Sequence, residues 1–278
     1  MSPTIVLIRH AQALHNETNK FPPHPHISHQ KLEKLTSYLP PQDHSIPDPR
    51  LTDHGIQQCS QLRYNLFQRF SSFEGRIAVI ASPMVRTLQT ASLATDWLVE
   101  RGVKIEADAD WQEQKSHRKK KKTAELSAKP CDTGSPLSLL PLIKDNQTKH
   151  QFSSPCYDFS AIPPVWPDKT EDPLAKSLFG YTRTAVLRRG RRCLEKLSKR
   201  PEDLIFVFSH AAFLRSGVSA WWYHNADYRI FTLHEELELK IDESTLEGGM
   251  GWSWNKRAEL GSEVPEDVTD DEIQEDKN

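Results

Sequence analysis

Two histidines follow the most apolar, strand-like runs of the sequence. His10 comes shortly after the run 4–8 (TIVLI), and His210 follows the run 204–208 (LIFVF). Continuous runs of β-branched and apolar residues are typical of strands buried on both faces of a parallel sheet. Both histidines therefore lie just beyond the C-terminal end of an expected strand, the edge where open α/β sheets bind ligands at a switch point.

Two arginines accompany these histidines. Arg9 directly precedes His10, and Arg86 falls on the first turn of the helix expected after a strand at 77–81. A guanidinium group offers planar donors that fit phosphate bidentately, and helix N-termini attract anions. One Arg-His pair after a strand is compatible with a purely structural role, but here separate strand ends offer two histidines and an arginine together. We therefore predict an anion site suited to phosphate.

Apolar spacing and end signals predict the elements that position these residues. Apolar residues recur every three or four positions over 51–70, where Thr52 is suited to cap a helix. Ser82 and Pro83 predict the start of the helix that carries Arg86, with the serine as the cap and the proline in the first turn. We further expect a strand at 103–107, a helix at 174–199 broken near Gly180 or Gly190, a helix from His210 through Trp222, and an edge strand at 229–233.

The alternation of strands and helices predicts an α/β fold with a mostly parallel sheet and right-handed crossovers. We expect one domain over residues 1–262, with irregular insertions at about 17–48 and 114–172, and an acidic disordered tail at 263–278. The first insertion lies next to the predicted site, where it either forms a lid or wall or is disordered.

Four histidines of the first insertion raise the question of a metal site. The region has no partner cysteines, no helical i,i+4 pair and six prolines, so we interpret it as a solvated loop. These histidines are His24, His26, His29 and His44.

Composition restricts the class of protein. The 278 residues have a mean hydropathy of −0.64 and a formal charge of −2. The last sixteen residues carry −7, which leaves +5 on the remainder, a balance that favours anion binding. No apolar run is long enough to span a membrane, and no CxxC pair is present. We expect no secretory leader, because no basic region precedes a long apolar stretch at the first residues. We expect a cytoplasmic protein with reduced thiols, in which the basic run Arg118–Lys122 leaves a nuclear location open.

Four segments resemble, in order, the motifs of the histidine phosphatase superfamily, also called phosphoglycerate mutase-like. They are LIRHAQALHN at 7–16, DPRLTDHGIQ at 48–57, SPMVRTLQTA at 82–91 and FVFSHAAFL at 206–214. PCDTGSP at 130–136 and NADYR at 225–229 are similar to a fungal-type cytosolic branch. The resemblance implies a three-layer sandwich with helices on both faces of the central sheet.

The resemblance also implies roles for the matching residues. His10 is then the nucleophile that forms a phosphohistidine, and Glu113 protonates the leaving oxygen and later activates water. The groups that bind the phosphoryl oxygens are Arg9, Asn16, Arg86, His210 and Ala211. An insertion leaves Glu125 as the alternative acid, although the local match favours Glu113.

Three departures from the family pattern bear on the site. Ala11 replaces the usual glycine, the pair Ala211-Ala212 replaces Gly-Gly, and the pair Gln12-Ala13 replaces a common Glu-Thr. Added methyl groups crowd the backbone beside the phosphate, and the last change removes a substrate contact.

The anion site and the family resemblance together predict hydrolysis of a small phosphomonoester. We expect no metal or other cofactor, and neither a nucleic acid nor a membrane as partner. Three alternatives remain open: a phosphoglycerate-type mutase, a non-catalytic phosphate-binding regulatory protein, and a phosphatase of phosphoproteins. The longer motifs of mutases are not recognised here, which favours hydrolysis. The sequence leaves the oligomeric state open.

Overall fold

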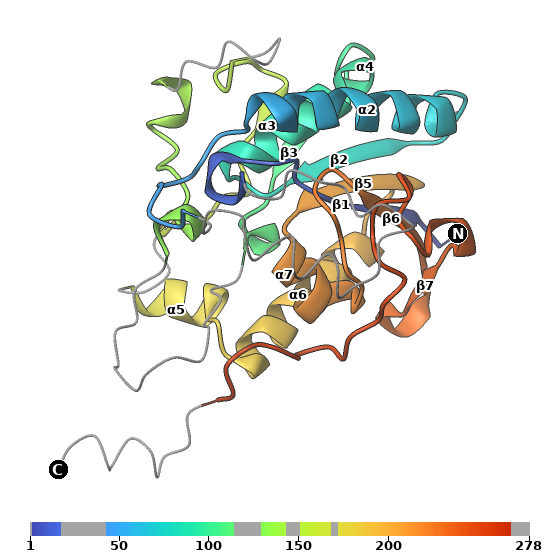
Figure 1. Cartoon of the computed structure of the whole chain (residues 1–278). Helices are drawn as coiled ribbons and strands as arrows, with labels where there is room; N and C mark the ends of the chain where they lie inside the picture. The colour runs from blue at the N-terminus through green and yellow to red at the C-terminus, as the bar shows by residue number, and fades with distance from the viewer. Residues whose placement is uncertain (1, 18–42, 114–128, 143–150, 168–171, 268–278) are drawn as a thin grey trace, which may run out of the picture.

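The computed structural model describes residues 2–17, 43–113, 129–142, 151–167 and 172–267 (Figure 1). Within them, seven strands form one sheet in the order β4-β3-β2-β5-β1-β6-β7. β1 to β5 are parallel, whereas β6 is antiparallel to β1 and to β7. The strands are β1 (Thr4–Arg9), β2 (Ile77–Ala81), β3 (Ile105–Ala107), β4 (Tyr157–Asp158), β5 (Leu204–Ser209), β6 (Tyr228–Leu233) and β7 (Leu239–Ile241).

The sheet separates two hydrophobic cores. Because successive strand residues point to opposite faces, alternate side chains of β1 enter different cores. One core includes α2 (Asp53–Phe70) and α3 (Val85–Ala94), and the other includes α6 (Arg183–Ser198) and the helical segment 211–219. Figure 1 shows these two groups of helices on opposite sides of the sheet. The predicted α/β sandwich with a mostly parallel sheet and helices on both faces is confirmed.

Shorter helical elements complete the described chain. The α-helices are α4 (Asp96–Val99), α5 (Pro173–Phe179) and α7 (Ala211–Phe213), and η5 (Leu214–Ser219) is a π-helix. The 3₁₀ turns are η1 (Leu14–Asn16), η2 (Ala109–Trp111), η3 (Pro130–Asp132), η4 (Leu140–Leu142), η6 (Glu235–Leu237) and η7 (Glu243–Thr245).

β1 and β5 lie side by side in the interior of the sheet, and the chain leaves them in opposite directions. After β1 it continues to α2 in one layer, and after β5 it enters α7 in the other. Adjacent parallel strands whose connections diverge create a switch point, where loops separate and leave room for a ligand. The predicted position of the two histidines at such a point is confirmed.

The helix that carries Arg86 begins later than predicted. α3 starts at Val85, and its N-cap residue Met84 provides no side-chain cap. The backbone N–H of Val85 is instead satisfied by Asp48 Oδ1 at 3.0 Å. The prediction that Ser82 caps the helix was wrong because a carboxylate distant in sequence serves the helix end.

The structure decides one open helix boundary and corrects another. The predicted helix 174–199 is broken at Gly180, between α5 and α6, and not at Gly190. Gly190 lies within α6, where an added Cβ would meet the Gly217 carbonyl oxygen at 1.7 Å, so this glycine permits close helix packing. The helix after His210 ends before Trp222, because Ala220 adopts a left-handed φ of 64°.

The observed sheet differs from the predicted one at two strands, β6 and β4. β6 is not an edge strand, because β7 pairs with it on its outer side. β4 occurs inside the segment 114–172 that the sequence predicts as irregular, and it pairs with β3. The two strands that were missed contain two and three residues, too short to show a period.

The first residues of the predicted disordered tail are packed. Val264 contacts the second core, and the carbonyl oxygen of Pro265 accepts a hydrogen bond from the Arg183 backbone at 2.7 Å. Glu263 pairs with Arg215. The prediction of disorder was therefore wrong for 263–267, and the rest of the tail lies outside the described residues. Outside them too are Glu125, the run 118–122 and most of the first insertion.

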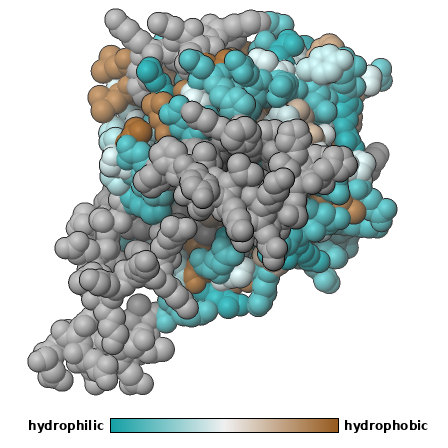
Figure 2. All heavy atoms as spheres, in the orientation of Figure 1, coloured by the Kyte–Doolittle hydropathy of each residue, from teal (hydrophilic) through white to brown (hydrophobic). Residues whose placement is uncertain are grey.

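The visible surface agrees with the low mean hydropathy. Among the coloured residues in Figure 2, hydrophilic ones predominate, and hydrophobic ones gather toward the upper left. No helix in the described ranges is both long enough and apolar enough to cross a membrane.

Gly55 allows α2 to approach the loop after β1. A Cβ at this position would lie 2.0 Å from the carbonyl oxygen of Gln12, which also accepts a hydrogen bond from the Thr52 backbone. We expect Gly55→Ala to lower the free energy of unfolding by about 1–3 kcal/mol, because backbone must move to make room. Chemical denaturation measures this effect, with Ser60→Ala on the exposed face of α2 as the control. Equal stability of Gly55→Ala and wild type would contradict the close approach.

Candidate active site

The two predicted histidines meet at the ends of β1 and β5. Arg9 pairs with Ser209 in register, so the next residue of each strand is a histidine. The His10 backbone N–H donates to the Ser209 carbonyl oxygen at 3.0 Å. The ring centroids of His10 and His210 are 5.1 Å apart, and the two residues are 2% and 0% exposed.

Arg86 reaches both rings from the start of α3. Its Nε donates to His10 Nε2 at 3.3 Å, and its Nη2 lies 3.2 Å from His210 Nδ1. Because arginine can only donate, both ring nitrogens act as acceptors. The opposite nitrogens then carry the protons: His10 Nδ1 donates to the Ala11 carbonyl at 2.7 Å, and His210 Nε2 donates to Ser82 Oγ at 2.9 Å.

The surroundings keep His10 neutral. Burial lowers its pKa well below the ordinary value of 6.5, and the positive charges of Arg86 and Arg9 lower it further. A neutral imidazole with its proton on Nδ1 carries its lone pair on Nε2, where it accepts the hydrogen bond from Arg86 until a phosphate takes its place as the partner of that guanidinium. The site thus combines a nucleophilic nitrogen with a cation that can bind the group it attacks.

Two residues that the sequence analysis did not place in the site hold Arg86. Nη1 donates to the Cys131 carbonyl oxygen at 2.8 Å, and Nη2 lies 3.7 Å from Asp132 Oδ1. Both residues are buried. In the sequence, the segment 130–136 showed only a similarity to a family branch and gave no sign of a contact with Arg86. A buried guanidinium needs acceptors, but which residues supply them depends on the fold.

Arg9 keeps unused hydrogen-bonding capacity. Nη1 donates to the Tyr223 carbonyl oxygen at 3.0 Å, whereas Nε is buried and has no partner among the described residues. Burial lowers the pKa of Arg9 to about 10, and the negative charge of Glu113 opposes that change. The guanidinium remains charged at neutral pH, with Glu113 within electrostatic range.

Glu113 contacts α7, and the loop just before it is bonded to the end of β5. Its Oε1 accepts the backbone N–H of Phe213 at 3.0 Å. Two residues earlier, the Trp111 carbonyl accepts Ser209 Oγ at 2.6 Å, which ties this loop to the end of β5. Glu113 therefore lies beside the segment that follows His210, and Glu125 lies outside the described residues.

Asn16 and Ala211 also lie around the two histidines. Asn16 Oδ1 accepts the Ala13 backbone N–H at 2.7 Å, and its Nδ2 donates to Asn225 Oδ1 at 3.3 Å. Asn225 Nδ2 in turn donates to the His10 carbonyl at 3.0 Å, so this second asparagine, missed by the sequence analysis, links the two. Ala211 directly follows His210 as the first residue of α7.

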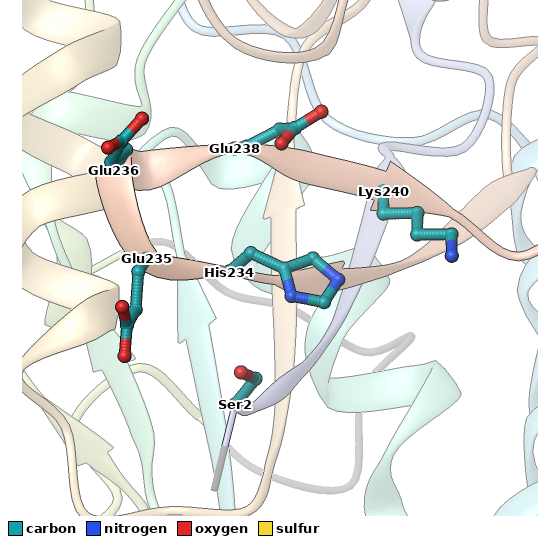
Figure 3. A pocket seen from close by; sticks show the side chains of 6 residues that line it. All are labelled: Ser2, His234, Glu235, Glu236, Glu238 and Lys240. Atoms are coloured by element: carbon teal, nitrogen blue, oxygen red, sulfur yellow. The ribbon is translucent and has the colours of Figure 1, made fainter.

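A different cavity lies at the opposite end of the sheet. It has a volume of about 430 Å³ and is formed by Ser2, before β1, together with His234, Glu235, Glu236, Glu238 and Lys240 around the β6–β7 turn. The three glutamates point in different directions in Figure 3. Across the described ranges, no group of three or more histidine, cysteine or acidic side chains is arranged to hold a metal.

Buried neutral histidines predict a loss of stability in acid. Burial, followed by nearby positive charge, lowers the pKa of His15 to about 2, and that of His10 is also lowered. Between the lowered pKa of each buried histidine and the ordinary value of 6.5, the unfolded chain binds more protons than the folded one. The free energy of unfolding therefore falls as the pH drops below about 6.5. Each histidine contributes about 1.4 kcal/mol per pH unit to this slope.

Substitution isolates this contribution. We expect His15→Asn to reduce the slope of the unfolding free energy between pH 6 and 4 by about 1 kcal/mol per unit, measured by denaturation at several pH values. Exposed His234→Asn is the control, because water solvates that ring in both states. An unchanged slope in His15→Asn would show that its ring takes up a proton without unfolding.

The fold and the site together define a class: an α/β protein whose switch point gathers two neutral histidines and two arginines, an arrangement suited to a phosphate group. The model of the histidine phosphatase superfamily (branch 1) matches residues 42–133, a segment that includes Arg86, Glu113, Cys131 and Asp132. The predicted resemblance to the histidine phosphatase superfamily is confirmed. The motifs that carry His10 and His210 lie outside this match, and the sheet brings them to Arg86.

Solved structures of low identity are similar over most of the chain. The alpha-ribazole phosphatase from Shigella flexneri is 14% identical with a TM-score of 0.46, covering 96% of this chain and 100% of that one. The ecdysone phosphate phosphatase from Bombyx mori is 16% identical with a TM-score of 0.46, covering 86% and 92%. A phosphoglycerate mutase from Bacillus anthracis is 12% identical with a TM-score of 0.43, covering 87% and 92%. None of the curated proteins compared with this chain matches it.

Proposed function

We propose that this protein is a metal-independent phosphatase that hydrolyses a small phosphomonoester through a phosphohistidine at His10. The observation that carries the proposal is the Nε2 atom of a buried, neutral His10, which faces the Arg86 guanidinium at 3.3 Å. A nitrogen lone pair beside a fixed cation is the combination needed to attack phosphorus while charge accumulates on the phosphoryl oxygens.

In the first step, His10 Nε2 forms a bond to phosphorus and the bond to the ester oxygen breaks. The anionic phosphate of the bound substrate favours the protonated form of Glu113. Glu113 then gives that proton to the departing oxygen, so the alcohol leaves neutral. Arg9 and Arg86 donate to the phosphoryl oxygens, and the free Nε of Arg9 adds a donor that has no partner in the described protein. His210 joins them once phosphate replaces it as the partner of Arg86 Nη2, because its proton can then lie on Nδ1 while Ser82 Oγ donates to Nε2. Asn16 and the Ala211 backbone N–H are the remaining proposed phosphate contacts.

In the second step, water attacks the phosphohistidine. Glu113, now a carboxylate, removes a proton from the water, and the bond from phosphorus to Nε2 breaks. Phosphate leaves, and both His10 and Glu113 return to their starting protonation states. Oxygen atoms and protons therefore balance over the cycle without any other reactant.

Hydrolysis of p-nitrophenyl phosphate with and without EDTA tests the reaction type, and rapid quenching in alkali tests the intermediate. We expect turnover that survives EDTA and a phosphoryl group on His10 that is stable in base and lost in acid. A stable phosphoenzyme with negligible hydrolysis would favour the mutase. Neither turnover nor phosphorylation in the folded protein would favour the binding protein.

Replacing Glu113 by glutamine is expected to separate substrates by leaving group. Because an alkyl alkoxide needs a proton to depart and a nitrophenolate hardly does, kcat/KM should fall on the order of 10²-fold for an alkyl phosphate and much less for p-nitrophenyl phosphate. A plot of rate against leaving-group pKa measures the change. The same pattern in Glu125→Gln, with Glu113→Gln unaffected, would assign the acid to Glu125.

A further inference from the structure

The histidine pair is part of a longer row of imidazole rings. His15, at the end of the loop that follows β1, lies with its ring centroid 5.8 Å from that of His10. His44 follows, 6.4 Å from His15. His10 and His15 are buried, whereas His44 is half-buried, so the row leads outward from the proposed nucleophile. The proposed reaction uses only the inner part of this row.

His15 differs from the inner histidines in its hydrogen bonding. It is 8% exposed, and its Nδ1 is buried with no partner among the described residues. Both ring nitrogens of His10, by contrast, have a protein partner. A buried polar atom without a partner costs free energy, and such atoms occur where a ligand completes the site.

The charges around His15 favour an anion. After burial, the groups that lower its pKa are Arg86, Arg9, His44 and Lys129, and each of them is cationic or becomes so by taking up a proton. The ring itself is therefore neutral and can donate one hydrogen bond. Lys129 is half-buried and is the N-cap residue of η3.

These observations identify positive potential and an unpartnered ring nitrogen beyond the groups assigned to the transferred phosphoryl. Arg86 is already shared among His10, His210, Cys131 and Asp132. His44 and Lys129 adjoin the partners of Arg86: His44 Nδ1 lies 3.4 Å from Cys131 Sγ, and the Lys129 carbonyl accepts the Asp132 backbone N–H at 2.9 Å.

We propose that His15, His44 and Lys129 form a subsite for a second anionic group of the substrate. The substrate class is then a small phosphomonoester that also carries a carboxylate or a second phosphate. The 5.8 Å between the His10 and His15 rings sets the spacing at a short carbon chain. The inference rests on the proposed function only for the fate of the first phosphate, because binding of the second anion requires no turnover.

Calorimetry with non-hydrolysable phosphonates tests the subsite. 3-Phosphonopropionate and 4-phosphonobutyrate carry a carboxylate, and propylphosphonate is the matched ligand without one. We expect wild type to bind at least one of the carboxylates about tenfold or more tightly than propylphosphonate, as a charge-assisted hydrogen bond provides. Lys129→Gln and His15→Asn should each reduce this ratio severalfold.

Controls separate a subsite from a general effect. Lys240→Gln removes a lysine at the opposite end of the sheet and should leave the ratio unchanged. Lys129→Gln decides the question if His15→Asn fails to fold, because Lys129 is only half-buried. A thermal melt of each variant identifies such a failure.

Each result has one interpretation. A ratio near one in wild type, or variants that weaken all the phosphonates equally, would overturn the subsite. A high wild-type ratio that falls in Lys129→Gln supports it, even if the protein hydrolyses no phosphomonoester, an outcome that would overturn only the phosphatase proposal. Turnover of p-nitrophenyl phosphate without any preference for carboxylates would retain the phosphatase and reject the subsite.

Discussion

His10→Ala is expected to reduce phosphatase turnover to background, on the order of 10⁴-fold or more. The substitution removes the nitrogen on which the phosphohistidine forms. Loss of a group that forms the covalent intermediate typically removes most of the rate enhancement. The measurement is kcat/KM for p-nitrophenyl phosphate in wild type and variant.

Folding and phosphate binding are the controls for this variant. Removing a ring that is 2% exposed leaves a cavity and reduces stability, so the assay temperature is set below the melting transition of the variant. Arg86 and Arg9 remain, and phosphate binding by calorimetry should persist. Substantial turnover in folded His10→Ala would mean that water attacks the ester directly, and the phosphohistidine mechanism would be abandoned.

Arg86→Met is expected to lower kcat by about 10²–10³-fold, because it removes the cation next to the nucleophile. It is also expected to destabilise the fold by about 3–5 kcal/mol, since Asp132 loses its buried partner and the Cys131 carbonyl loses a donor. Both effects arise from one side chain, so activity alone does not separate them.

The double variant Arg86→Met/Asp132→Asn separates the two effects. Neutralising Asp132 removes the buried charge that Arg86 no longer faces, so we expect most of the lost stability to return while kcat stays low. Arg86→Lys keeps the charge, but a single ammonium group cannot reach two rings and a carbonyl at once, so it should recover little of the rate. If the double variant recovered activity together with stability, Arg86 would be a structural residue and not a phosphate ligand.

Much of the inner site could be predicted from local sequence. The runs at 4–8 and 204–208 are continuous and apolar, and such runs form interior strands with little dependence on the rest of the chain. A residue just after such a strand is carried to the sheet edge by the strand itself. For that reason the positions of His10 and His210 followed from the sequence, and so did that of Arg86 after the strand at 77–81.

The partners of these residues were not predictable in the same way. Asp48 supports the start of α3 from 37 positions away, and the Cys131 carbonyl reaches Arg86 across 45. A capping signal is read within a few neighbouring residues, so Ser82 was the natural local choice and it was wrong. Contacts of this length depend on how loops cross the sheet edge, which periodicity does not encode.

In the outer part of the site, too, the contacts between residues could not be predicted from local sequence. His44 lies in a proline-rich segment that the sequence analysis interpreted as a solvated loop, and His15 was left without a role. The tertiary structure places the His15 ring near His10, and the His44 ring near His15 and the Cys131 thiol.

The sequence alone determined the α/β class, the buried strands and the residue types that meet at their ends, because strand formation and side-chain chemistry are local properties. The tertiary structure decided the order of the strands, the tautomers of the two histidines and the acceptors that hold Arg86. These depend on which loops come together, and the free energy of such contacts is set by the burial of groups far apart in the chain.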